Sequence, residues 1–132
     1  MSNVVLVSIA LMGILLFLLG ANVTRHRAAR GRSGGDQASS DPADDLFIAV
    51  RAHGNAAEYV PTLAVLLLIA AQVTDGWWLD VLAVAAVAAR VSHAVGLLSS
   101  GSLAQRSPLR EVGAMLTYLT GTALGITVIA AL

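Results

Sequence analysis

Four long apolar runs, separated by polar segments of unequal length, dominate the hydrophobic pattern of the chain. They cover roughly residues 4–21, 46–73, 77–100 and 108–131. Each run meets or comes close to the roughly 20 apolar residues that a helix needs to cross a bilayer. The runs are too long for strands and lack their period-two alternation. The pattern predicts an all-α integral membrane protein, a four-helix bundle that forms one domain over residues 1–132.

Composition supports a membrane protein and excludes several kinds of chemistry. The 132-residue chain is 57% hydrophobic and 12% charged, whereas a soluble domain is about 25% charged. The formal net charge is zero, which gives no indication of a nucleic-acid partner. There is no cysteine, and therefore no disulfide, thiolate metal site or cysteine nucleophile. The histidines are scattered along the chain, so we expect no metal site.

Arginine placement predicts the orientation in the membrane. The segment 22–45 holds four arginines followed by four aspartates, and its Gly, Ser and Asp content indicates a flexible loop. Arg106 precedes the fourth run, whereas the turn TDGWWLD between runs two and three has no basic residue. The positive-inside rule then places loops one and three in the cytoplasm and both termini on the other side. Composition favours a bacterial source, and hence the inner membrane.

Ionisable and polar side chains interrupt the apolar runs in a regular way. The second run contains RAHGNAAEYVP, residues 51–61. At 100° per residue, Arg51, Asn55 and Glu58 fall within about 60° of one another, and Tyr59 lies at the edge of that face. Further polar groups come from the third and fourth runs, at Arg90, His93 and Arg110.

Charge counting suggests what these residues do. An ionised side chain at mid-bilayer costs about 2.5–3.5 kcal/mol on insertion scales, so these charges need partners or water. One possibility is that Glu58 pairs with Arg90, or with Arg51, and simply holds the bundle together. However, three arginines against one carboxylate leave two cations that a bound anion would neutralise. Glu58 would meanwhile accept an ammonium group. The site therefore suits a small zwitterion with excess negative charge, entering from the cytoplasmic side.

These residues, in this order, resemble the MAPEG family, the membrane-associated proteins in eicosanoid and glutathione metabolism. The resemblance is carried by R-x-x-x-N-x-x-E-Y-x-P in the second run, RVSHAVG in the third and SPLREVG at the start of the fourth. It covers essentially the whole chain. It implies a homotrimer of four-helix subunits that binds glutathione at the cytoplasmic side, between neighbouring subunits.

The resemblance also implies a role for each polar residue. Arg110 matches the family arginine near the glutathione thiol, where a cation favours the nucleophilic thiolate. The thiolate would then attack a small lipophilic electrophile or a hydroperoxide, as in a microsomal-type glutathione transferase or peroxidase. The positions that would contact glutathione are Arg51, Asn55, Glu58, Tyr59, Arg90 and His93.

The chain departs from well-studied eicosanoid enzymes at a few positions. Leu97 stands where they carry a tyrosine, and Glu111 and Ala114 follow Arg110. Glu111 is expected to weaken the pull of Arg110 on a thiolate. These differences argue against an assigned eicosanoid substrate. Two alternatives stay open: a family member that binds a thiol or lipid without turnover, and a small proton-coupled exporter that uses Glu58.

Overall fold

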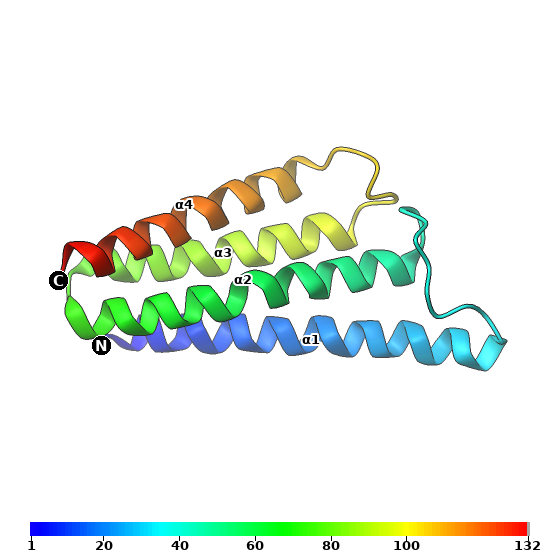
Figure 1. Ribbon diagram of the computed structural model, residues 1–132, viewed down its shortest axis with the longest axis horizontal. Helices are drawn as coiled ribbons and strands as arrows, with labels where there is room; N and C mark the ends of the chain where they lie inside the picture. The colour runs from blue at the N-terminus through cyan, green and yellow to red at the C-terminus, as the bar shows by residue number, and fades with distance from the viewer. Residues whose placement is uncertain (132) are drawn as a thin grey trace.

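The computed structural model describes residues 1–131 as a bundle of four long helices joined by three connections (Figure 1). All four are apolar and long enough to cross a membrane. The predicted all-α fold is confirmed, and the described residues contain no strand. Leu132, the last residue of the predicted domain, lies outside the described residues. The helices are α1 (Asn3–Ser33), α2 (Asp45–Val73), α3 (Trp77–Leu98) and α4 (Pro108–Ala130).

The helices run alternately up and down, and both termini lie at one end of the bundle (Figure 1). We call this the terminal end, and the opposite end, which carries the segments 34–44 and 99–107, the loop end. Helix α3 contacts all three other helices, and α2 does the same. In the described part of the chain α1 and α4 do not touch. The bundle therefore has two places where three helices meet, one between α1, α2 and α3 and one between α2, α3 and α4.

Helix α1 is longer than the sequence pattern predicted. We expected it to end near residue 21 and a flexible loop to cover residues 22–45, but the helix continues to Ser33. Residues 22–33 are polar, yet arginine and alanine are strong helix formers. Arg30 and Arg32 lie in the last turn, where cations are favourable at the negative end of the helix dipole. Gly34 then closes the helix in the left-handed conformation, with φ 70°.

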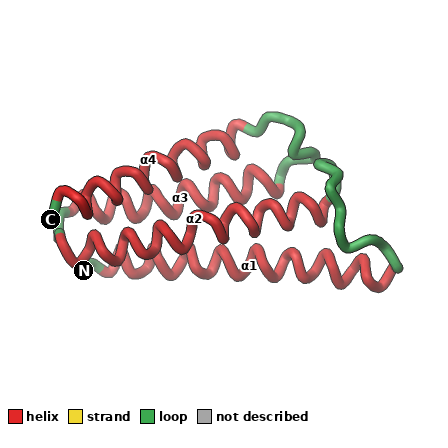
Figure 2. Tube along the Cα trace, in the orientation of Figure 1, coloured by secondary structure: helices red, strands yellow, loops and turns green. Residues whose placement is uncertain are grey.

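The connection that follows α1, drawn as a loop in Figure 2, is held to α1 by contacts of Arg30. Arg30 forms an ion pair with Asp44 and donates to the Asp36 carbonyl at 3.1 Å. Asp44 is also the N-cap of α2, because its carboxylate accepts from the Phe47 N–H at 2.9 Å. The Arg30 guanidinium and then the Phe47 N–H lower the pKa of the Asp44 carboxyl below its ordinary value. The first loop is thus held by a charged contact at its base.

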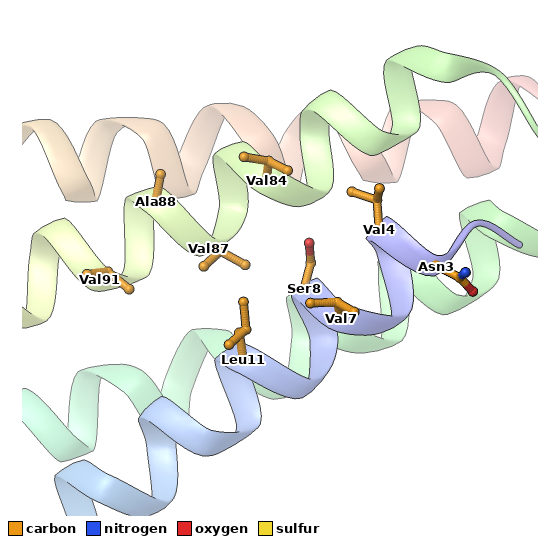
Figure 3. Close-up of a pocket in the computed structure, with 9 residues that line it drawn as sticks. All are labelled: Asn3, Val4, Val7, Ser8, Leu11, Val84, Val87, Ala88 and Val91. Atoms are coloured by element: carbon orange, nitrogen blue, oxygen red, sulfur yellow. The ribbon is translucent and has the colours of Figure 1, made fainter.

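An apolar groove of about 520 Å³ opens between α1 and α3 on the half of the bundle nearer the terminal end. Figure 3 shows side chains of the two helices facing one another across it. Five of its lining residues are valines, whose branched side chains have few rotamers. It lies apart from the polar residues identified above. Its lining residues are Asn3, Val4, Val7, Ser8, Leu11, Val84, Val87, Ala88 and Val91.

Candidate functional site

Arg90 of α3 lies at the centre of a polar cluster inside the bundle. Its side chain is only 1% exposed. Nη2 donates to Asn55 Oδ1 on α2 at 2.6 Å, and Nη1 donates to Thr117 Oγ1 on α4 at 3.2 Å. The guanidinium carbon lies 5.4 Å from the centre of the Tyr59 ring, at cation–π distance. The structure therefore brings Asn55, Tyr59 and Arg90 together, as the sequence suggested.

The Arg90 guanidinium has no carboxylate partner in the described part of the chain. The ion pairs there are Arg30–Asp44 and Arg106–Glu111. The alternative in which Glu58 pairs with Arg90 or Arg51 is therefore not seen within the described chain. In addition, Arg90 Nε is buried and lacks any hydrogen-bond partner. Burying a cation without a counter-ion is costly, so the cluster has the character of an anion site.

Arg51 and Glu58 occupy the outer surface of α2 rather than the cluster itself. Both are exposed on the single chain, although they lie in a helix that can cross a membrane. Neither belongs to an ion pair among residues 1–131. Because charged side chains avoid lipid, this surface of α2 is suited to contact with water, a polar ligand or another protein surface.

His93 and Arg110 meet where α3 and α4 cross. His93 Nδ1 lies 2.9 Å from the Arg110 carbonyl oxygen. Since a carbonyl can only accept, Nδ1 carries a proton and donates, and in the neutral ring Nε2 keeps its lone pair. The bond fixes the orientation of a buried imidazole. It lies three residues along α3 from Arg90, on the same side of the helix.

Two glycines allow this crossing. A Cβ on Gly113 would lie 2.5 Å from the His93 backbone nitrogen, and one on Gly96 would lie 2.4 Å from the Arg110 nitrogen. Any side chain there would force α3 and α4 apart. Both glycines lie in apolar runs, where the sequence gives them no special role. Without knowledge of which helices touch, sequence reasoning could not connect these two glycines with the site.

The Arg110 guanidinium is turned toward the loop that precedes α4. Nη1 donates to the Leu103 carbonyl at 3.3 Å, and Nη2 donates to the Gln105 carbonyl at 3.0 Å. The carboxylate of Glu111 is engaged elsewhere. It accepts from Arg106 Nε at 2.9 Å and Nη2 at 2.8 Å. Glu111 therefore has a cationic partner of its own, which reduces its expected effect on Arg110.

The sequence reading did not assign Thr117 and Tyr118 to the site. Thr117 is buried, accepts from Arg90 and donates to the Gly113 carbonyl at 2.8 Å. The Tyr118 ring lies 5.8 Å from that of Tyr59 at an angle of 56°. Thr117 follows Arg110 by seven residues, a same-face spacing that could have signalled it. A groove of about 300 Å³ runs along this side, lined by Tyr59, Thr62, Leu63, Leu66, Thr117, Tyr118, Gly121 and Thr122.

The chemistry available at this cluster is that of guanidinium, imidazole, amide and hydroxyl groups. Within residues 1–131 no group of three or more His, Asp or Glu side chains is placed to hold a metal ion. Guanidinium groups bind carboxylates and phosphates, and a nearby cation stabilises a thiolate. The fold and the cluster together define a four-helix membrane protein with an internal cationic site.

Comparison with known proteins identifies the family. The model of the MAPEG family matches residues 5–130, nearly the whole chain. The chain therefore belongs to the MAPEG family and is an integral membrane protein, which confirms the resemblance carried by its motifs. Members of this family include glutathione-dependent transferases and peroxidases as well as proteins without enzymatic activity. A search of curated proteins finds no match.

Proposed function

We propose that this protein binds glutathione, or a similar small thiol, at the Arg90-centred cluster and activates its thiolate. The thiolate would attack a lipophilic electrophile or reduce a hydroperoxide. The observation that carries the proposal is the buried Arg90 guanidinium, which has no carboxylate partner among residues 1–131. A ligand carboxylate would neutralise it and give Nε the acceptor that it lacks.

Glutathione fits the remaining groups as well. It has two carboxylates, one ammonium and a thiol. Arg51 and Arg90 would take the carboxylates, and Glu58 the ammonium. Asn55, Tyr59 and His93 would supply neutral hydrogen-bonding groups. The exposure of Arg51 and Glu58 on the single chain supports a ligand that extends from the buried cluster to the surface of α2.

Arg110 would act on the thiol. Two of the five guanidinium N–H groups donate to loop carbonyls, so three remain for a ligand. A cation at this position stabilises the thiolate relative to the thiol and lowers the thiol pKa.

The thiol proton passes to water. The sulfur then forms a bond to the electrophilic carbon, and a leaving group departs from that carbon with the bonding electron pair. With a hydroperoxide, the sulfur attacks the outer oxygen, the O–O bond breaks to release an alcohol, and a second glutathione displaces water from the resulting sulfenic acid to give glutathione disulfide. The groove beside Tyr59 and Tyr118, which Leu63 and Leu66 also line, offers apolar walls for such a substrate.

Assembly and orientation complete the proposal. Arg51 and Glu58 are exposed on a helix that can span the membrane, and such charges need cover from lipid. A second copy of the chain, in the homotrimer that the family resemblance implies, would provide this cover. Loops one and three would face the cytoplasm and both termini the other side, in a bacterial inner membrane.

The test is a titration of the detergent-purified protein with glutathione, followed by the ultraviolet absorbance of the thiolate. The wild type is expected to give a saturable signal. Arg110→Gln should lose it, because glutamine can still donate to a loop carbonyl but carries no charge. Arg25→Gln is the matched control, since Arg25 is exposed and donates only to Asn22 on its own helix. Equal signals from Arg110→Gln and the control would refute the role of Arg110.

A thiol binder without turnover is the second candidate. Leu97, which replaces the family tyrosine, is 6% exposed and packs in the apolar core. Its position therefore supplies no hydroxyl to a bound thiol. Binding heat without a thiolate signal would favour this candidate. The exporter alternative is tested by the efflux of a cationic dye from cells that express the wild type or Glu58→Gln. An exporter would show efflux with the wild type that is lost in Glu58→Gln.

A further inference from the structure

The two loops at the loop end are joined by one backbone hydrogen bond. The N–H of Leu103, in the segment 99–107, donates to the Pro42 carbonyl of the segment 34–44 at 2.8 Å. The carbonyl of the same residue accepts from Arg110 Nη1 at 3.3 Å. Leu103 therefore contacts the first loop through its N–H and the Arg110 guanidinium through its carbonyl oxygen.

The first loop is fixed at the point where this bond is made. The Asp44 N–H donates to the Asp41 carbonyl at 3.0 Å, which closes a turn around Pro42. Asp44 is in turn ion-paired with Arg30 of α1. A continuous series of contacts thus runs from α1 through the first loop and Leu103 to Arg110.

Arg110 depends on such support for its position. It lies in the first turn of α4, where the positive end of the helix dipole repels a cation. Its side chain forms no ion pair among residues 1–131. In the described structure its guanidinium donates hydrogen bonds to the loop carbonyls of Leu103 and Gln105. Where these carbonyls lie decides which way the guanidinium points.

We propose that the first loop positions the Arg110 guanidinium through the Pro42–Leu103 hydrogen bond, and that Leu103 and Asp44 are positioning residues for the thiolate. This inference rests on the proposed function, because it assumes that Arg110 acts on a bound thiol. In addition, a loop outside the four apolar helices would control how strongly Arg110 stabilises the thiolate. The loop sets the thiol pKa without contacting the ligand.

A single substitution can remove the hydrogen bond between the two loops while leaving the local turn in place. Leu103 is the second residue of a turn closed by the Gln105 N–H donating to the Ser102 carbonyl at 3.2 Å, and proline is favoured at that position. Leu103→Pro deletes the N–H that donates to Pro42 and keeps the turn. Leu103→Ala is the matched control, because it removes the side chain that packs against the core but keeps the N–H.

The first readout is the pH profile of thiolate absorbance with saturating glutathione. Leu103→Pro is expected to raise the apparent pKa of the bound thiol by about half a unit to one unit, a threefold to tenfold loss of thiolate at lower pH. Leu103→Ala should keep the wild-type profile. Affinity for S-methylglutathione, which has no ionisable thiol, should be the same in all three proteins. Unchanged profiles in both variants, or equal shifts in both, would overturn the proposal.

The second readout needs no ligand and separates the two proposals. The ¹⁵N–¹H signals of the Arg110 guanidinium in micelles report whether the group is held by the loop. Leu103→Pro should free the guanidinium to move and so average its signals. Asp44→Asn should do the same, because asparagine still caps α2 but cannot form an ion pair with Arg30. If the wild type gives no thiolate signal, the proposed function fails. The guanidinium signals still show whether the first loop positions Arg110. Signals that stay unaltered in both variants would overturn this positioning.

Discussion

Replacing Arg90 with methionine should weaken glutathione binding without weakening the fold. Arg90 is 1% exposed and lacks a carboxylate partner among residues 1–131. Its interaction with a ligand carboxylate would be a charge-assisted hydrogen bond, worth about 1.5–3 kcal/mol. This corresponds to an increase of about 10-fold to 150-fold in the dissociation constant for glutathione.

The effect of Arg90→Met on stability has opposing parts. The Asn55 and Thr117 oxygens lose a donor, which costs about 1–3 kcal/mol for a buried acceptor. The cation–π contact with Tyr59 is also lost, worth roughly 1–2 kcal/mol at a buried site. Against this, a buried cation disappears, which relieves a desolvation penalty of several kcal/mol. The two sides are of similar size, so the Tm of the ligand-free protein should change little.

Two measurements on the same samples decide this prediction. Calorimetric titration with glutathione gives the dissociation constant, and thermal unfolding in detergent without ligand gives the Tm. Arg25→Gln is the matched control for loss of a positive charge at an exposed site. A clear fall in the Tm of Arg90→Met together with unchanged affinity would show that Arg90 is structural and would refute the reasoning.

Two further predictions concern the helix crossing and the first loop. Gly113→Ala, whose Cβ would lie 2.5 Å from the backbone nitrogen of His93, should destabilise the protein by about 1–3 kcal/mol. Gly125→Ala, with open space at its Cβ, should have no cost, and thermal unfolding of both compares them. The contact with Arg30 lowers the pKa of the Asp44 carboxyl. The stabilisation of the first loop by this contact is therefore full above the ordinary carboxyl pKa and is lost as the pH falls through the lower folded-state pKa. The protection of residues 34–44 against hydrogen exchange, corrected for the slower intrinsic exchange at low pH, should therefore fall on acidification in the wild type but not in Asp44→Asn. Equal pH dependence of the protection in both proteins would contradict this.

The four helices could be predicted because each apolar run is long and polar segments separate the runs clearly. The end of α1 could not be predicted in this way, because hydropathy measures transfer into lipid and not the tendency to form a helix. Residues 22–33 are too polar for the bilayer but still helical, and they end only at Gly34. A compositional reading therefore mistakes a projecting helix for a loop.

The site was predictable within helices but not between them. The spacing of Asn55 and Tyr59 places them on one side of α2, and Arg90 contacts both. However, the sequence does not reveal how one helix is rotated against the next. For that reason the sequence left a Glu58–Arg90 pair open as an alternative, although the described chain does not form it, and it did not reveal the carbonyl partners of Arg110. The contribution of Gly96 and Gly113 appears only once α3 and α4 are placed in contact.

The most direct test of the central claim is the ionisation of glutathione bound to the wild type. Thiolate absorbance would be recorded at stepwise pH with saturating ligand, against free glutathione as the reference. Our account predicts a bound thiol whose apparent pKa lies well below the roughly 8.5 of an unperturbed thiol. A bound thiol that titrates like the free one, or no saturable signal at any pH, would contradict it.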